Sequence, residues 1–214
     1  RTPISVLKEK ISLLDDPATG PLNDKQRETL AVAWQSITRL HQLFDRLLTF
    51  VAASESGMGA DNTPADISAY IEKLAKLIPT LYPQAKINIV KNIARGLPKV
   101  MMNGDKLDLI FSNLVDNAVK FNTKPEVLIN ISAAKGPDKT VSIIFSDNGS
   151  GIPPEDRDRV FEKFYQIEKY FTGQVEGIGL GLALVKKLVE EAGGTIRLES
   201  RLKIGSDFFF TLPV

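Results

Sequence analysis

Apolar side chains in the first 56 residues recur every three or four positions, which is the spacing of one face of a helix. The stripe contains Ile4, Leu7, Ile11 and Leu14, and then Leu30, Ala33, Ile37, Leu40, Phe44, Leu47 and Val51. Between these two runs, segment 15–21 carries two prolines and a glycine and breaks the pattern. Residues 1–56 are therefore predicted to form a helical hairpin with the heptad register of a bundle.

The apolar face of this hairpin is wider than two helices can bury, because Trp34 and Leu48 add a second stripe beside the first. Two hairpins that associate as a four-helix bundle would cover it, which predicts a homodimer. The alternative is that the hairpin packs only on the rest of its own chain.

Beyond a predicted linker at 57–65, the hydrophobic pattern mixes two periods. Helical spacing covers 67–81, 106–121 and 179–192, and alternation typical of strands covers 86–90, 127–133, 140–145, 195–198 and 208–212. Helices combined with an antiparallel or mixed sheet predict an α/β sandwich over residues 66–214. The fold class expected for the whole chain is α+β.

Composition removes several classes of function. With 27 basic and 26 acidic residues the formal net charge is +1, so we expect no nucleic-acid partner. The lack of cysteine excludes disulfides and thiolate sites, and a single histidine, His41, excludes a multi-histidine metal cluster within the chain. No apolar stretch reaches the roughly 18 residues of a membrane span. The chain begins with Arg1 and not Met, so we expect a fragment, and a membrane contact only through segments outside it.

Polar side chains on one helix are the first candidates for chemistry. Asn113, Asn117 and Lys120 lie at positions i, i+4 and i+7, on a single helical face. An amide oxygen is a hard, neutral ligand suited to Mg²⁺, and lysine supplies a point charge for phosphate. A solvated helix face shows the same pattern, so the spacing alone leaves both interpretations open.

Two glycine-rich segments follow. Segment 147–151 comes directly after a β-rich run, and either forms a simple turn or lets Asp147 accept a hydrogen bond from the amine of adenine. In segment 177–181 three glycines alternate before a helix, where backbone N–H groups suit phosphate oxygens. It is neither a Walker loop, because no Gly-Lys-Ser/Thr follows, nor a dinucleotide fingerprint, because no βαβ unit surrounds it.

The order and spacing of these segments resemble the catalytic ATP-binding domain of histidine kinases. This domain belongs to a wider group shared with type II topoisomerases, heat-shock chaperone ATPases and mismatch-repair ATPases. The resemblance covers 66–214 and places the N-box at 113–121, glycine boxes at 147–151 and 177–181, an F-box at 161–166, and the usual ending at 193–196 and 205–213.

The resemblance implies ATP and Mg²⁺ as cofactors. Asn117 would coordinate Mg²⁺ with help from Asn113, Lys120 would contact phosphate, and Phe121 would flank the adenine, whose amine Asp147 would read. The full set expected to bind the cofactor is Asn113, Asn117, Lys120, Phe121, Asp147, Gly149, Gly151, Ile152, Gly177, Gly179, Leu180, Gly181 and Leu182.

The resemblance also separates a kinase from a hydrolase. Hydrolases of this group carry a water-activating glutamate where this chain has Asn113, and an amide cannot act as a general base. Residues 164–177 would form a lid over the nucleotide. Many relatives have an arginine at the position of Gln166, so a lid cation would come from Lys163 or Lys169, between which the sequence does not choose.

The hairpin resembles a kinase dimerisation and phosphotransfer stem. Residues 1–3, Arg-Thr-Pro, match the end of the H-box, which would place the phosphoacceptor histidine three residues before Arg1. Thr2 would position water for dephosphorylation of a response regulator. His41 has no glutamate after it, and a structural role is expected.

We therefore expect the cytoplasmic portion of an inner-membrane sensor kinase, with Asn113, Lys120 and Thr2 as catalytic residues. It would dimerise through its stem and pass phosphate to a response-regulator receiver domain. The alternatives are a non-catalytic nucleotide-binding scaffold, a regulator phosphatase in which ATP only sets conformation, and an ATP hydrolase.

Overall fold

The computed structural model describes residues 2–16, 20–55, 63–167 and 179–214. It divides into two compact units, residues 1–52 and residues 53–214.

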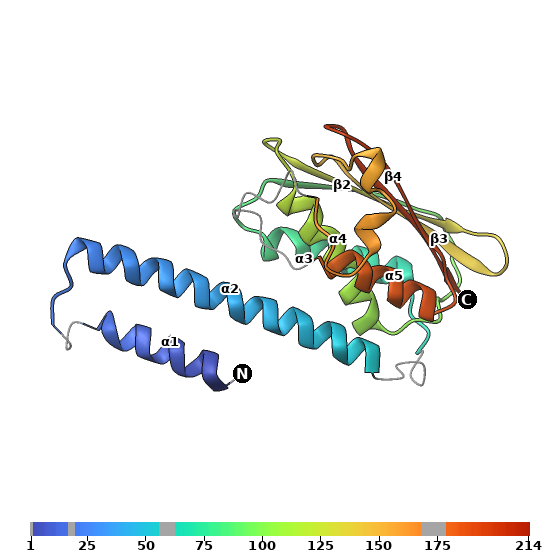
Figure 1. Ribbon diagram of the computed structural model, residues 1–214. Helices are drawn as coiled ribbons and strands as arrows, with labels where there is room; N and C mark the ends of the chain where they lie inside the picture. Colours follow the sequence, from blue (N-terminus) through green and yellow to red (C-terminus); the bar gives the residue numbers. More distant parts are fainter. Residues whose placement is uncertain (1, 17–19, 56–62, 168–178) are drawn as a thin grey trace. The chain divides into compact units, whose positions relative to one another are not determined.

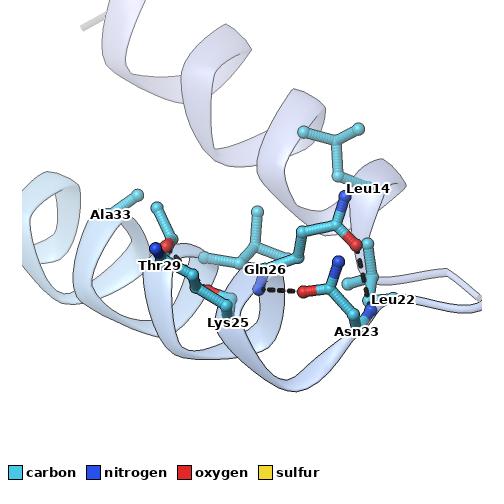
Figure 2. Close-up of a pocket in the computed structure, with 8 residues that line it drawn as sticks. Leu14, Leu22, Asn23, Lys25, Gln26, Thr29 and Ala33 are labelled. Carbon is cyan, nitrogen blue, oxygen red and sulfur yellow. Dashed lines mark hydrogen bonds between the residues drawn. The ribbon is translucent and has the colours of Figure 1, made fainter.

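The first unit is the predicted helical hairpin, with α1 at Thr2–Leu14 and α2 at Asp24–Glu55 (Figure 1). The N-cap of α2 is Asn23, which exchanges hydrogen bonds of 2.9 Å with Gln26: each side chain accepts from the other residue's backbone N–H. A hollow of about 370 Å³ lies beside this cap, between Leu14 and the first turns of α2 (Figure 2). None of the residues predicted to bind nucleotide lines it.

The second unit is a five-stranded sheet with helices on one face (Figure 1). The strand order is β1-β2-β3-β5-β4, and only the β1–β2 pair is parallel. The elements are α3 (Ile67–Leu81), β1 (Ile87–Ile93), α4 (Gly104–Lys120), β2 (Val127–Lys135), β3 (Thr140–Asp147), the 3₁₀ turns η2 (Pro154–Asp156) and η3 (Arg159–Phe161), α5 (Gly181–Glu191), β4 (Ile196–Arg201) and β5 (Gly205–Pro213). The predicted α+β class is confirmed, with a mixed sheet.

The core lies between the sheet and α4. Phe111 of α4 contacts Phe145 of β3 and Phe210 of β5, with ring centroids 6.5 and 5.9 Å apart. All three rings are buried, as alternation along the strands and the 3.6-residue period of the helix require. Because α4 turns this apolar face to the sheet, its other face, with Asn113 and Asn117, stays partly exposed.

Apart from α3, the helices and strands of the second unit differ from the predicted ranges by one to three residues at one or both ends. β5 begins at Gly205, three residues before the expected start, because its pairing with β3 continues as far as Asp147. Ala65, in the predicted linker, forms a reciprocal bridge with Val100, with both N–O distances at 2.9 Å. Among the helices described, none is both long and apolar enough to cross a membrane.

Candidate nucleotide-binding site

The N-box side chains on the polar face of α4 differ in their hydrogen bonding and contacts. The amide nitrogen of Asn113 donates to Leu109 O, one turn back, at 2.6 Å. The Asn117 side chain makes no hydrogen bond within the described part of the chain, and it is half-buried. Lys120 places its Nζ 4.8 Å from the Phe121 ring centroid, at the C-terminal end of the helix. Asn117 is thus the amide on this face that can turn to an external ligand.

Asp147 stands at the end of β3 in a half-buried position. Burial raises the pKa of its carboxyl from 3.8 to about 6. Hydrogen bonds from the backbone N–H groups of Gly149 and Ser206 lower that pKa, as does the charge of Lys124, whereas the Asp207 carboxylate raises it. The bond from Gly149 N to Asp147 Oδ1 is 2.7 Å long. A half-buried carboxylate held by two backbone donors is suited to accept one more hydrogen bond from a ligand.

The first glycine box is attached to the end of the N-box and to the β4–β5 hairpin. Ser150 N donates to Phe121 O at 2.9 Å. Gly151 has φ +70°, and a Cβ there would lie 2.1 Å from the carbonyl oxygen of Arg201. Ile152 N donates to Ser200 Oγ at 2.8 Å. Only glycine fits this close approach of two backbones. The three contacts together hold the first glycine box against segments that are distant in the sequence.

The second glycine box leads into α5, beside the N-box. A Cβ on Gly181 would lie 2.7 Å from Asn113 Oδ1, so the start of α5 packs directly on the N-box side chain. The N-cap residue, Leu180, supplies no side-chain hydrogen bond to the first N–H groups of the helix. Leu180 itself is buried and Leu182 is half-buried. An uncapped helix start that opens with glycine suits a phosphate group.

The predicted lid is described only at its base. Phe164 N, at the start of the predicted lid, donates to Gly179 O at 2.9 Å. Tyr165 donates its hydroxyl to Asp156 at 2.5 Å, which raises the pKa of the tyrosine. Gly177 and Lys169 lie outside the described residues, so the source of a lid cation stays an open prediction.

The residues present fit a magnesium ion that arrives with a triphosphate. No group of three or more His, Cys, Asp or Glu side chains that could hold a metal exists in the described ranges. Mg²⁺ keeps several waters and commonly takes only one or two protein ligands together with phosphate oxygens. A single available amide, Asn117, with Asn113 one turn away, matches that arrangement and does not match a stand-alone metal centre.

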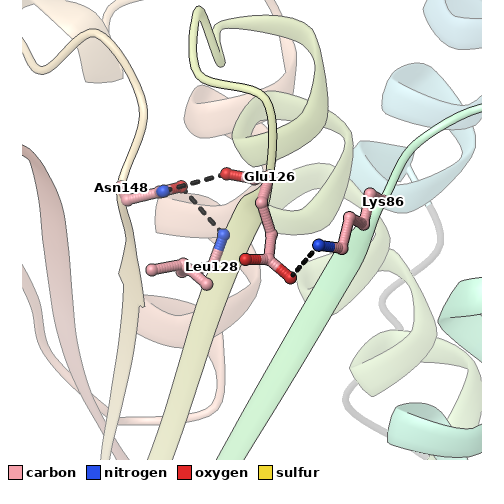
Figure 3. Close-up of polar contacts among 4 residues, drawn as sticks. All are labelled: Lys86, Glu126, Leu128 and Asn148. Atoms are coloured by element: carbon pink, nitrogen blue, oxygen red, sulfur yellow. Dashed lines mark hydrogen bonds and ion pairs between the residues drawn. The ribbon is translucent and has the colours of Figure 1, made fainter.

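Three further residues build the site and were missed from the sequence. Ser200 and Ser206 are buried with their Oγ atoms 3.0 Å apart, and Ser200 Oγ also donates to Gly205 O at 2.8 Å. Asn148 binds the start of β2 with its side-chain amide (Figure 3). Two features of the sequence could have indicated these residues. Ser200 and Ser206 are polar residues at strand positions where alternation predicts burial, and Asn148 is an asparagine directly after a strand.

Thr2 is the first residue of α1, in the first unit. The other predicted site residues that the structure describes are all in the second unit. They lie on α4 and its C-cap, in or next to the two glycine boxes, and in the first turn of α5.

Comparison with known proteins agrees with this geometry. Residues 102–214 match the family described as Histidine kinase-, DNA gyrase B-, and HSP90-like ATPase. This match covers more than half of the 214 residues, and the chain belongs to that family.

Particular relatives narrow the class to histidine kinases. The Sensor protein SrrB of Staphylococcus aureus strain N315 is 32% identical over 217 residues, a match that covers 100% of this chain and 36% of SrrB. The solved structure of full-length ShkA in complex with AMPPNP is 27% identical with a TM-score of 0.76, covering 100% of this chain and 43% of ShkA. The catalytic domain of histidine kinase ThkA shares the fold, at 24% identity and a TM-score of 0.59, over 71% of this chain and 96% of its own. This chain therefore carries a histidine-kinase catalytic ATP-binding domain, and it spans little more than a third of the curated relatives it matches.

Proposed function

We propose that the chain is the core of a histidine kinase that binds ATP with Mg²⁺ and transfers the γ-phosphoryl group to a histidine. The observation that carries the proposal is the convergence of the two glycine boxes on the N-box helix α4. Ser150 N of the first glycine box bonds Phe121 O, and Gly181 of the second packs on Asn113. The AMPPNP bound to ShkA supports an ATP site in the shared fold.

Each group in the site then has a role. Asp147 accepts the adenine amine, the first N–H groups of α5 and Lys120 hold the phosphates, and Asn117 holds the metal. Bound Mg²⁺ would neutralise phosphate charge and fix its orientation. Phosphoryl transfer passes through a loose transition state, so positioning and charge stabilisation supply most of the catalysis.

The acceptor is a histidine outside these 214 residues, expected three positions before Arg1. His41 is not proposed, because the residue after it is Gln42 and not the glutamate that follows the acceptor in the H-box. Asn113 offers no general base for water, which favours transfer to the imidazole over hydrolysis.

The hairpin is proposed to dimerise and to receive the response regulator. Its apolar stripe stays exposed along α2, for example Leu40 at 49% and Phe44 at 38%. A second hairpin would bury such a stripe in a four-helix bundle. The phosphoryl group would then pass to an aspartate of a receiver domain. In a separate phosphatase step, Thr2 would position the water that hydrolyses this aspartyl phosphate. We place this unit in the cytoplasmic portion of an inner-membrane sensor.

Two measurements test the proposal. Binding of a fluorescent ATP analogue to this chain, competed with ADP, should depend on Mg²⁺. The full-length protein incubated with γ-labelled ATP should form an acid-labile, base-stable phosphoprotein. Steady phosphate release without phosphoprotein would instead indicate a hydrolase. A folded protein that binds no nucleotide would indicate a scaffold.

A further inference from the structure

We propose that Asn148 is a positioning residue for adenine recognition: its side-chain amide locks the end of β3 to the start of β2 and so sets where the Asp147 carboxylate stands. This inference rests on the proposed function, since it takes Asp147 as the group that reads the adenine amine.

The geometry is a three-point attachment immediately after the adenine residue. Asp147 is the last residue of β3 and pairs with Ile129 of β2. Asn148 Oδ1 accepts from Leu128 N at 2.8 Å, and its Nδ2 donates to Glu126 O at 3.0 Å (Figure 3). Its backbone N also donates to Leu128 O, at 3.3 Å. The side-chain amide therefore substitutes for a peptide group and extends the β2–β3 ladder beyond the strand end.

The attachment fixes the direction of the residues on both sides of Asn148. The next backbone N–H, of Gly149, points at Asp147 Oδ1, and the one after it, of Ser150, reaches Phe121 O. Without the Asn148 amide the turn from 147 to 150 would lose two of the hydrogen bonds that hold it to β2. The Asp147 carboxylate could then move relative to the end of the N-box.

The ion pair between Glu126 and Lys86, next to the Asn148 amide, contributes much less to holding this turn in place. Glu126 also pairs with Lys86 at 3.6 Å, but the Lys86 side chain is 76% exposed, and exposed ion pairs add little. The side-chain amide of Asn148 is half-buried and makes its bonds to backbone groups. The positioning effect is therefore assigned to the amide and not to the ion pair.

The preference of the site for ATP over ITP depends on the position of the Asp147 carboxylate, whereas the stability of the fold does not report that position. Adenine donates its 6-amine to a carboxylate, whereas hypoxanthine presents a 6-oxo oxygen that the carboxylate repels. A site built to accept a hydrogen bond rejects an analogue that lacks the donor, and the ratio of the two affinities depends on where the acceptor stands. Partial loss of folded protein would lower ATP and ITP binding equally and leave the ratio unchanged.

The experiment measures Kd for ATP and ITP by competition with a fluorescent ATP analogue, with folding checked by circular dichroism. Wild type should prefer ATP. Asn148→Ala should lower the ATP/ITP preference about tenfold, the equivalent of roughly one hydrogen bond. Asn148→Asp keeps the shape and the acceptor for Leu128 N, but it replaces the donor to Glu126 O by a carboxylate oxygen that repels this carbonyl. Its ATP/ITP preference should therefore fall as well, and this variant serves if the alanine variant does not fold. Asn130→Ala, an exposed asparagine on β2, is the matched control and should keep the wild-type preference.

A folded Asn148 variant with the wild-type ATP/ITP preference overturns the inference, even if both affinities fall together, and leaves the proposed function standing. A wild-type protein that fails to bind ATP, or that binds ITP equally well, overturns the adenine assignment and this inference with it.

Discussion

Replacing Asp147 with asparagine should stabilise the nucleotide-free protein near neutral pH and weaken nucleotide binding. Burial raises the pKa of this carboxyl from 3.8 to about 6. Because the folded-state pKa lies above the unfolded one, Asp147 contributes stability that is fully present below about pH 3.8 and is lost as pH rises through about 6. A shift of this size corresponds to about 3 kcal/mol for the ionised form at pH 8.

Asparagine removes the charge and keeps the shape and an acceptor for Gly149 N. The expected gain at pH 8 is therefore at most about 3 kcal/mol, and about 1–2 kcal/mol once the weaker hydrogen bonds to a neutral amide are included. The gain should vanish near pH 4, where the aspartate of the wild type is protonated in the folded state. Nucleotide binding should weaken for ATP and ADP alike, because both carry adenine.

The assay is urea unfolding of wild type and variant at pH 8 and at pH 4, with free energies extrapolated to water. Asp138→Asn, in the exposed turn between β2 and β3, is a matched control and should show no such pH-dependent gain. An Asp147→Asn protein that is less stable than wild type at pH 8, or whose gain is the same at both pH values, would refute the electrostatic reasoning. A binding loss confined to ATP would contradict the adenine role.

Three further results are expected. Asn117→Ala should abolish Mg²⁺-dependent nucleotide binding in a magnesium titration, and unchanged affinity would contradict the metal assignment. Gly151→Ala should destabilise the protein by about 2–4 kcal/mol in thermal unfolding, because a Cβ there would lie 2.1 Å from a backbone oxygen at φ +70°. Gly96→Ala, at φ +67° with nothing within 4 Å, should cost only about 1 kcal/mol, and equal losses would disprove the packing argument. Leu40→Asp should convert the proposed hairpin dimer to monomer in light scattering, whereas Val32→Asp, off the stripe, should not; a dimer in both variants would place the interface elsewhere.

Much of the fold follows from local periodicity in the sequence. Helix α3 has the bounds that the spacing of apolar residues predicts, Ile67–Leu81, and α4 begins two residues and ends one residue before the predicted range. Both carry a continuous apolar face, which is a property of neighbouring residues and needs no knowledge of what it packs against. The order of the N-box and the glycine boxes is likewise present in the sequence and led to the histidine-kinase family before any geometry.

The tertiary structure alone decided how those segments become a site. The order of the strands in the sheet is set by tertiary structure. The contact of Gly151 with Arg201 and the hydrogen bond between Ile152 and Ser200 each join residues about 50 positions apart. Burial of Asp147 and the attachment of Asn148 to β2 arise in the same way. Periodicity records which face of an element is apolar, but the partner of a buried polar group is chosen by contacts distant in sequence, and those form only when the chain folds.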